Sequence, residues 1–243
     1  MNNEEVLVQG FVIKSVEYKE SDAIITCLTS GGIFSFKARG VLKPGSKNAA
    51  SCLLYAYSEF VLQEKDNYYF LTKGKLLSSN FKLYDSIDNM CILGLISESI
   101  LNFLDKPSPI IYNMFQRLIQ GINQHFDILT LAVLSLAKII VESGYGLITN
   151  QCVRCGKKTR IVSIDYSDGG FICLDCINDK KDVDSPEYLK SIRYSFMVDC
   201  DDFFHYEFKK EIAIRLIKEY MNYLLDQFGY RKVNFYDLFN NLY

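Results

Sequence analysis

Hydrophobic and polar residues alternate with a period of two over the first third of the chain. Turn-forming residues such as Ser30-Gly31-Gly32 and Lys43-Pro44-Gly45 separate five short segments of this kind. These segments are residues 6–13, 23–29, 33–39, 53–62 and 68–72. Five short strands within about 75 residues are typical of a small closed barrel, so we predict a five-stranded OB-fold over residues 1–80. An SH3-like barrel fits the same pattern.

From residue 82 the hydrophobic pattern changes to that of helices. Ser86 can cap the first helix, Gly144 can stop the third, and Ser185-Pro186 has the cap-then-proline order of a helix start. The first predicted helix ends at about residue 104 and the second at about residue 122. A third covers residues 126–143 and a short fourth begins at residue 186. The last two cover residues 206–228 and 235–242. We therefore expect a multi-domain α+β protein, with a barrel over residues 1–80 and a helical domain over 81–243.

Two Cys-x-x-Cys pairs interrupt the helical region. Seventeen residues separate the first pair, Cys152 and Cys155, from the second pair, Cys173 and Cys176. An alternating segment with an Asp-Gly-Gly turn lies between the pairs. A hairpin of this kind brings the pairs together as a zinc ribbon, inserted at about residues 150–178, with four thiolates for a structural Zn²⁺. Two disulfides or a redox dithiol are the alternatives, although no βαβ pattern surrounds the cysteines.

The bulk composition is that of an ordinary globular protein with a net charge of −2. No signal-like start and no apolar run of eighteen residues is found, so we expect a cytoplasmic protein without a membrane segment. Four further cysteines lie in apolar contexts and are expected to be buried free thiols: Cys27, Cys52, Cys91 and Cys200.

One stretch of the chain is basic, although the net charge of the whole chain is close to zero. Residues 23–58 contain no acidic residue and four basic ones, Lys37, Arg39, Lys43 and Lys47. Such a strip on a mildly acidic protein indicates a polyanion site, although a solvated loop that happens to lack acids would look the same.

The period of two places these cations relative to the barrel core. Phe34 and Phe36 share the face expected to be core, whereas Lys37 and Arg39 share the outer face at about the spacing of adjacent phosphates. Lys43 and Lys47 lie on a loop rich in glycine, proline and serine that can close over an extended ligand. Tyr55 and Tyr57 are the expected stacking residues, and Lys14 and Lys19 could extend the track.

Other polar residues give weaker signals. The ribbon cations Arg154, Lys157, Lys158 and Arg160 either offset the charge of a zinc–thiolate cluster or form a second nucleic-acid patch. His125 and His205 stand in unrelated contexts, and Asp199, Asp201 and Asp202 form an acidic turn that we expect to be solvated. No phosphate loop, G-x-S-x-G or H-E-x-x-H motif occurs, so we expect a binding protein and not an enzyme.

Four stretches together resemble the RecO family of bacterial recombination-mediator and DNA-repair proteins. They are G-F-V-I-K-S-V-E-Y-K-E-S-D at 10–22, F-K-A-R-G-V-L-K-P-G-S-K at 36–47, the segment from E-S-G-Y-G-L at 142 through both cysteine pairs, and L-L-D-Q-F-G-Y-R-K-V-N-F at 224–235. The resemblance covers the whole length and keeps the order barrel, helices, ribbon, helices.

The resemblance implies an OB-fold that binds single- and double-stranded DNA and promotes annealing. It also implies that the protein acts together with RecR and, in some bacteria, with RecF. The family helps to load RecA onto strands coated by single-stranded-DNA-binding protein, and it contacts the acidic tail of that protein. By match to the family's basic strand and loop, Lys37, Arg39, Lys43 and Lys47 would contact DNA. Two other functions stay open: a protein–protein adaptor with weak DNA binding of its own, and a thiol-dependent enzyme.

Overall fold

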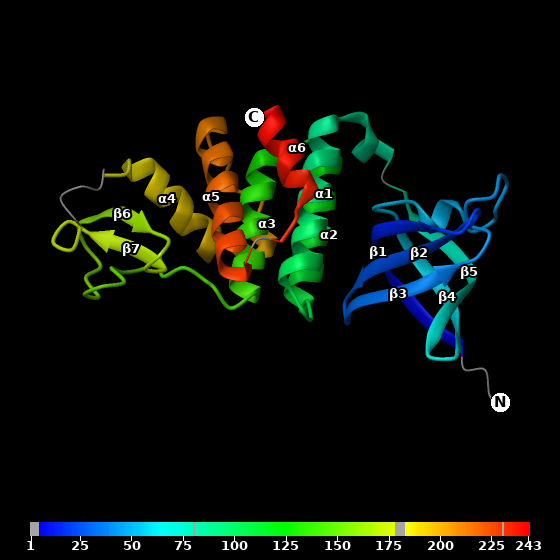
Figure 1. Cartoon of the computed structure of the whole chain (residues 1–243). Coiled ribbons are helices and arrows are strands. Elements are labelled where there is room, and N and C mark those ends of the chain that lie inside the picture. Colours follow the sequence, from blue (N-terminus) through cyan, green and yellow to red (C-terminus); the bar gives the residue numbers. More distant parts are fainter. Residues whose placement is uncertain (1–4, 80, 178–182, 230) are drawn as a thin grey trace. The chain divides into compact units, whose positions relative to one another are not determined.

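The structure is a computed structural model that describes residues 5–79, 81–177, 183–229 and 231–243. It divides into two units, Met1–Leu83 with Lys106–Tyr112 and Tyr84–Asp105 with Asn113–Tyr243 (Figure 1). The expected ends of the barrel domain at residue 80 and of the ribbon at residue 178 lie outside the described residues.

The first unit contains a closed barrel of five strands. The strands are β1 (Glu5–Tyr18), β2 (Asp22–Thr29), β3 (Gly32–Ala38), β4 (Tyr57–Lys65) and β5 (Tyr68–Ser78). Their order around the barrel is β1-β2-β3-β5-β4, and β4 closes onto β1. Neighbours are antiparallel except for β3 and β5, which are parallel. This crossed order is that of a five-stranded Greek-key barrel, so the predicted OB-fold is confirmed over the SH3-like alternative.

Alternate residues of each strand fill the barrel interior. Ile25, Phe36 and Phe60 are at most 2% exposed, and Phe34 is partly buried against the same core, as the alternation predicts. The β4–β5 hairpin turns through Asp66 and Asn67, whose φ angles of 52° and 62° are those of a type I′ turn.

The fourth strand starts later than the sequence pattern indicates. Residues 53–56 are not strand; a 3₁₀ turn over Ala50–Cys52 precedes them and β4 begins at Tyr57. Tyr55 has a φ of 61°, and its N–H donates to the carbonyl of Val12 at 2.7 Å. The chain therefore bends here under a contact with β1, which a pattern of apolar residues alone does not reveal.

Among the residues that the structure describes, six α-helices make up most of the rest of the chain. They are α1 (Ile87–Phe103), α2 (Pro109–Asn123), α3 (Ile128–Glu142), α4 (Pro186–Met197), α5 (Lys210–Phe228) and α6 (Asn234–Leu242). Ser86 and Ser185 cap α1 and α4 through their hydroxyl oxygens, as predicted, and Gly229 ends α5 with a φ of 66°. The predicted start of α5 at residue 206 is wrong by four residues, because the Phe208 N–H donates to the Thr130 hydroxyl instead of joining a helix.

The helices of the second unit pack around α3. This helix contacts α1, α4 and α5, and it lies between α1 and α5 (Figure 1). Helix α6 packs so closely on α1 that a Cβ atom at Gly94 would lie 2.4 Å from the ring of Phe235. Within the described ranges, no helix combines the length and apolar character that a membrane crossing requires.

Candidate metal centre and nucleic-acid interface

A two-stranded hairpin carries the four clustered cysteines. Strands β6 (Ile161–Asp165) and β7 (Gly170–Cys173) are antiparallel, as predicted, and Cys173 is the partner of Ile161 in the register. Because Cys173 ends β7, the Cys173–Cys176 turn follows the hairpin directly. The Val153 N–H donates to the carbonyl of Phe171 at 2.8 Å, which holds the Cys152–Cys155 turn against β7.

Both cysteine pairs lie on tight backbone turns. The carbonyl of Cys152 accepts from the Gly156 N–H at 2.9 Å, and Gly156 has a φ of 75°, which favours glycine. The carbonyl of Cys173 accepts from the N–H groups of Cys176 at 2.9 Å and Ile177 at 3.0 Å. Each turn therefore presents its two sulfur atoms on the same side.

The four sulfur atoms form one cluster that could hold a metal ion. All of them lie within 4.8 Å of one another, and the Sγ atoms of Cys155 and Cys173 are 3.5 Å apart. Sulfur atoms placed at 2.3 Å around a tetrahedral Zn²⁺ would be about 3.8 Å apart, so the cluster has the right size. Cys152 and Cys173 are buried, Cys176 is half-buried and Cys155 is exposed.

The backbone around the cluster favours a thiolate at one position. Burial alone would raise the pKa of Cys152, but the backbone N–H groups of Cys173, Cys155 and Arg154 outweigh it and lower this pKa to about 6. The pKa of Cys176 is raised to about 12, first by its hydrogen bond with Cys155 and then by burial. Metal binding would have to displace the proton of such a thiol.

Carboxylates of the ribbon neutralise most of its cations. Arg154 Nε lies 2.5 Å from Asp168 Oδ2, and Lys157 Nζ lies 2.5 Å from Asp175 Oδ2. Arg160 pairs with the other oxygen of Asp175 at 3.2 Å. These three cations therefore have local carboxylate partners, which leaves less positive charge for a nucleic acid than the sequence pattern indicates.

A polar network joins the ribbon to two helices. Tyr166, which follows β6, donates to Glu219 Oε2 on α5 at 2.7 Å, and Tyr188 on α4 donates to the same oxygen. Arg215 binds the second oxygen of Glu219 at 2.8 Å and Asp184 at 2.9 Å. Because Tyr166 lies in the ribbon and Glu219 on α5, the network fixes the ribbon's orientation on the helical unit.

Two of the predicted DNA-binding residues, Lys37 and Arg39, lie over aromatic rings on the outside of the barrel, of which Tyr68 is exposed and Phe70 is half-buried. Lys37 Nζ is 3.9 Å from the ring centroid of Tyr68 and 5.7 Å from that of Phe70, its parallel partner on β5. Arg39 Cζ is 4.5 Å from the Phe70 centroid, and Lys37 Nζ is 5.8 Å from that of Tyr18. We call Tyr18, Lys37, Arg39, Tyr68 and Phe70 the aromatic face.

The rings of this face were not found from the sequence. Tyr18 is 41% exposed and Tyr68 is 55% exposed, whereas Tyr69 and Leu71 pack against the barrel core. The period of two across residues 68–71 separates these pairs and would have identified the outer ones.

Tyr55 and Tyr57 do not share a strand face, so this expectation is wrong. Tyr55 lies before β4 and is only 3% exposed. The ring of Tyr57 packs 4.9 Å from that of Phe11, and its hydroxyl lies 3.4 Å from that of Tyr112. Neither ring offers a free face comparable to that of Tyr68.

The remaining predicted cations lie on β1, in the β1–β2 turn and in the loop after β3. Lys19 is in the β1–β2 turn with its ammonium 5.4 Å from the Tyr18 ring, and Lys14 pairs with Thr26 on the same outer surface as Lys37. Lys43 packs near Gly40, which is bonded through its N–H to Asp22 beside that turn. Lys47 is further away.

Lys47 precedes Asn48, whose side chain accepts from the N–H of Gly74 on β5 at 3.0 Å. Gly74 is four residues from Phe70, or roughly 13 Å along the strand. In the described part of the chain, none of the six predicted cations (Lys14, Lys19, Lys37, Arg39, Lys43 and Lys47) forms an ion pair with a carboxylate.

Some of the other residues singled out from the sequence have partners in the structure. Asp201 pairs with Arg117 of α2, and His205 lies 3.1 Å from Asp202. The side chains of Asp201 and Asp202 are 83% and 54% exposed, so the acidic turn is solvated as expected. Three of the isolated cysteines are buried free thiols as expected, whereas Cys200 is only half-buried: the buried ones are Cys27, Cys52 and Cys91.

Comparisons with known proteins agree in matching one family along nearly the whole chain. The model of the family "Recombination protein O N terminal" matches residues 1–80, and that of "Recombination protein O C terminal" matches residues 85–232. The chain is 29% identical over 236 residues to "DNA repair protein RecO" of Mesoplasma florum, covering 93% of this chain and 87% of that one.

Two further relatives of the same name show similar coverage. The protein of Oceanobacillus iheyensis is 24% identical over 91% of this chain and 88% of its own length. That of Listeria monocytogenes is 25% identical over 97% of this chain and 89% of its own length. Both matches extend across the barrel, the helices and the ribbon.

Proposed function

The chain belongs to the recombination protein O (RecO) family, and on this premise we propose that it is a DNA-binding recombination mediator. In this proposal it binds single- and double-stranded DNA, anneals complementary strands and helps to load RecA with RecR during DNA repair and homologous recombination. The observation that carries the proposal is the aromatic face, where Lys37 lies over the exposed ring of Tyr68 and Arg39 over the half-buried ring of Phe70, and neither cation has a carboxylate partner among the described residues.

The position of the aromatic face agrees with the way OB-folds bind oligonucleotides. They use the face of strands 2 and 3 together with the loops that join strands 1 to 2 and 4 to 5. Lys37 lies on β3, Tyr18 lies at the end of β1 beside the first of these loops, and Tyr68 follows the second. A strand on this surface would find phosphate partners and stacking partners together.

Annealing by this surface requires no bond-making residue. Cations that neutralise phosphates on two strands lower the repulsion between them. Contacts to the backbone, and to the flat faces of bases, leave the Watson–Crick edges available for pairing. Lys14, Lys19, Lys43 and Lys47 would extend the track of phosphate contacts on either side of Lys37 and Arg39.

The four-cysteine cluster is proposed to hold a structural Zn²⁺. Four thiolates fill a tetrahedral site and leave no open position for a substrate, so the ion would stabilise the ribbon and take no part in a reaction. The sulfur spacing and the two backbone turns support Zn²⁺ over a redox dithiol.

The proposed protein partners are inferred from membership of the family and not from a particular surface on this chain. We propose that RecR and the acidic tail of single-stranded-DNA-binding protein bind directly, and that RecA is reached indirectly. A protein adaptor with weak DNA binding of its own is the second candidate, and the overall acidity, with a pI near 5.8, favours it.

Strand annealing distinguishes these two functions. Two complementary oligonucleotides carrying a fluorophore and a quencher are mixed with the intact chain, with Lys37→Ala/Arg39→Ala, or with Lys73→Ala/Lys75→Ala. The last variant is the matched control, because it removes the same charge from exposed positions of β5 outside the aromatic face. We expect the first variant to lose most of the acceleration and the control to keep it. Little or no acceleration by all three chains would favour the adaptor, whereas equally strong acceleration by all three would place the DNA site away from the aromatic face.

A further inference from the structure

The eight cysteines of the chain differ in how far they are exposed to solvent. All eight lie among the described residues, and Cys155 alone of them is exposed. Cys176 and Cys200 are half-buried, and the other five are buried. Burial raises the pKa of Cys52 and that of Cys91 to about 11, so these two thiols stay neutral and unreactive at physiological pH. A reagent dissolved in water therefore meets Cys155 first.

The exposed sulfur of Cys155 lies beside a buried sulfur of the other turn. The Sγ atoms of Cys155 and Cys173 are 3.5 Å apart, and an S–S bond is about 2.05 Å long, so the two sulfurs need to approach each other by only about 1.5 Å. Cys173 is buried at the end of β7, where its sulfur is close to Cys155 but shielded from a dissolved reagent. One sulfur is thus placed to be oxidised and the other to react with the oxidised sulfur.

We propose that Cys155 is a site of oxidation by hydrogen peroxide and that the product is a disulfide between Cys155 and Cys173. The Cys155 thiolate attacks one oxygen of the peroxide, the O–O bond breaks, and a sulfenic acid and a hydroxide ion form. The Cys173 thiolate then attacks the Cys155 sulfur, the S–O bond breaks, and a second hydroxide leaves as the disulfide forms. The two sulfurs together lose two electrons, the peroxide gains them, and two protons from solvent convert the hydroxides into water.

This oxidation would empty the metal site, if the cluster holds Zn²⁺ as the proposed function states. Only Cys152 and Cys176 would remain as ligands, which is too few for a structural site that needs four. The new bond would join the two cysteine turns, so they would stay together without the metal. A thiol reductant would then restore all four ligands by exchange with the disulfide.

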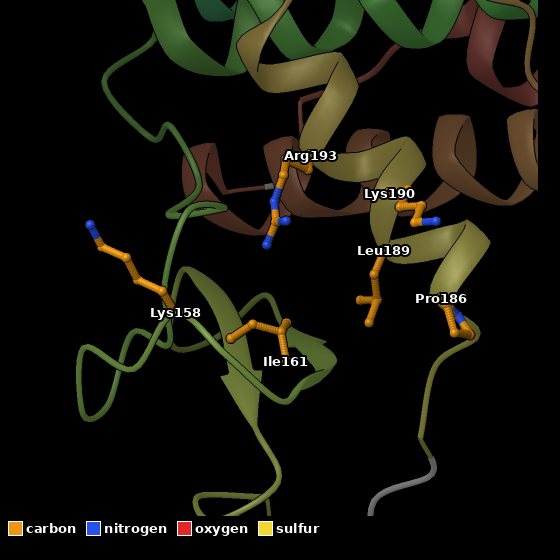
Figure 2. A pocket seen from close by; sticks show the side chains of 6 residues that line it. All are labelled: Lys158, Ile161, Pro186, Leu189, Lys190 and Arg193. Carbon is orange, nitrogen blue, oxygen red and sulfur yellow. The ribbon is translucent and has the colours of Figure 1, made fainter.

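The contacts that dock the ribbon on the helices do not involve the cysteine side chains. Tyr166 donates to Glu219 at 2.7 Å, and Arg193 Nε on α4 donates to the carbonyl of Thr149 at 2.9 Å. A pocket of about 230 Å³ lies between the ribbon and α4 at Arg193, and the residues that line it include no cysteine. Figure 2 shows Arg193 and Leu189 extending from α4 toward the ribbon. We therefore expect the oxidised ribbon to stay docked, which makes the modification reversible.

Trapping the first oxidised sulfur in the intact chain tests this proposal. The chain is treated with an equimolar amount of hydrogen peroxide and with dimedone, which labels sulfenic acids, and the labelled cysteines are identified by mass spectrometry. We expect Cys155 to be labelled about tenfold or more faster than Cys200, the half-buried cysteine outside the cluster, because oxidation follows exposure and thiolate character. Without dimedone, peptide mapping should find the Cys155–Cys173 disulfide, and dithiothreitol should remove it.

Two variants and a metal assay separate the possible outcomes. Cys173→Ser lacks the second sulfur and should accumulate the label on Cys155, whereas Cys200→Ser should form the same disulfide as the parent. First labelling at another cysteine of the intact chain, or a disulfide within one Cys-x-x-Cys pair, would overturn the proposal. A chain that contains no zinc but forms the Cys155–Cys173 disulfide would contradict the structural Zn²⁺ and support the oxidation site. A zinc-loaded chain whose cysteines all stay reduced would contradict the oxidation site alone.

Discussion

At the scale of single residues, the cations of the barrel and those of the ribbon differ in what surrounds them. Arg154 and Lys157 contact carboxylates at 2.5 Å, whereas Lys37 contacts the ring faces of Tyr68 and Phe70. An aromatic ring orients a cation without neutralising it, and exposed cation–π contacts contribute only about 0.5–1 kcal/mol. Lys37 therefore keeps its charge available for a phosphate, and Arg154 does not.

The exposed ring of Tyr68 should distinguish single strands from duplexes. Replacing it in Tyr68→Leu removes a stacking surface worth about 1–3 kcal/mol per base, which lowers single-strand affinity by about fivefold or more. Duplex affinity should change little, because paired bases are not available for stacking. Competition anisotropy with both forms measures this, and Tyr206→Leu, at a 40% exposed tyrosine of the helical unit, is the control. Equal losses for the two forms would contradict stacking at Tyr68.

The cysteines also divide by their surroundings. Cys91 is buried among apolar groups, and burial raises its pKa to about 11, so it remains a neutral thiol at physiological pH. Cys152 has backbone donors that lower its pKa to about 6. Among the described residues, only the ribbon cluster combines a lowered thiol pKa, that of Cys152, with the spacing of a metal site.

Loss of one ribbon thiol should release the metal and loosen the ribbon. We expect Cys173→Ser to contain no stoichiometric zinc by mass spectrometry and to melt at a lower temperature, because metal binding supplies folding free energy to small sites of this kind. Hydrogen exchange should become faster over residues 150–177. Cys200→Ser, outside the cluster, should keep both metal and stability. A Cys173→Ser protein with the melting curve of the parent would refute a structural metal here.

At the scale of elements, the sequence predicts most of what local chemistry determines. The serines at 86 and 185 fix two helix starts, and the period of two places Lys37 outside and Phe36 inside the barrel. The hydrophobic pattern does not predict the bend at residues 53–56, because this bend depends on a hydrogen bond from Tyr55 to Val12, more than forty positions away. The pocket at Arg193 was not predictable for the same reason: it needs the docking of α4 against the ribbon.

The docking of the ribbon should make stability fall at high pH. Burial, followed by the charge of other groups such as Glu219, raises the pKa of Tyr188 above its ordinary value of about 10, and Tyr166 is affected in the same direction. Above pH 10 the unfolded chain loses these protons while the folded chain retains them. The free energy of unfolding should then decrease with rising pH, by about 1.4 kcal/mol per pH unit for each such tyrosine.

Urea denaturation between pH 9 and pH 11 measures this dependence. The Tyr188→Phe variant has no ionisable group at this position. Its free energy of unfolding should therefore decrease less steeply than that of the parent between pH 9 and pH 11. At pH 7 it should already be less stable by about 1–3 kcal/mol, because Glu219 loses a buried hydrogen-bond donor. A slope identical to that of the parent would show that Tyr188 is not protected from ionisation.

At the scale of the whole molecule, a small basic surface lies on a chain that is acidic overall. The chain has a net charge of −2, yet residues 23–58 have four cations and no acid. The proposed DNA binding would then depend on a few phosphate contacts, and it would be sensitive to salt. Four to six contacts correspond to a single-strand slope of roughly −3 to −4 in log affinity against log salt, at about 0.7 per contact.

The most direct test of DNA binding by the barrel is this slope. Anisotropy of a labelled single-stranded oligonucleotide is measured across a salt series for the intact chain, for Lys37→Ala/Arg39→Ala and for the control Lys73→Ala/Lys75→Ala. Loss of two phosphate contacts should make the slope shallower by about one to two units in the first variant and leave it unchanged in the control. Identical weak curves for all three chains would contradict a DNA site on the aromatic face.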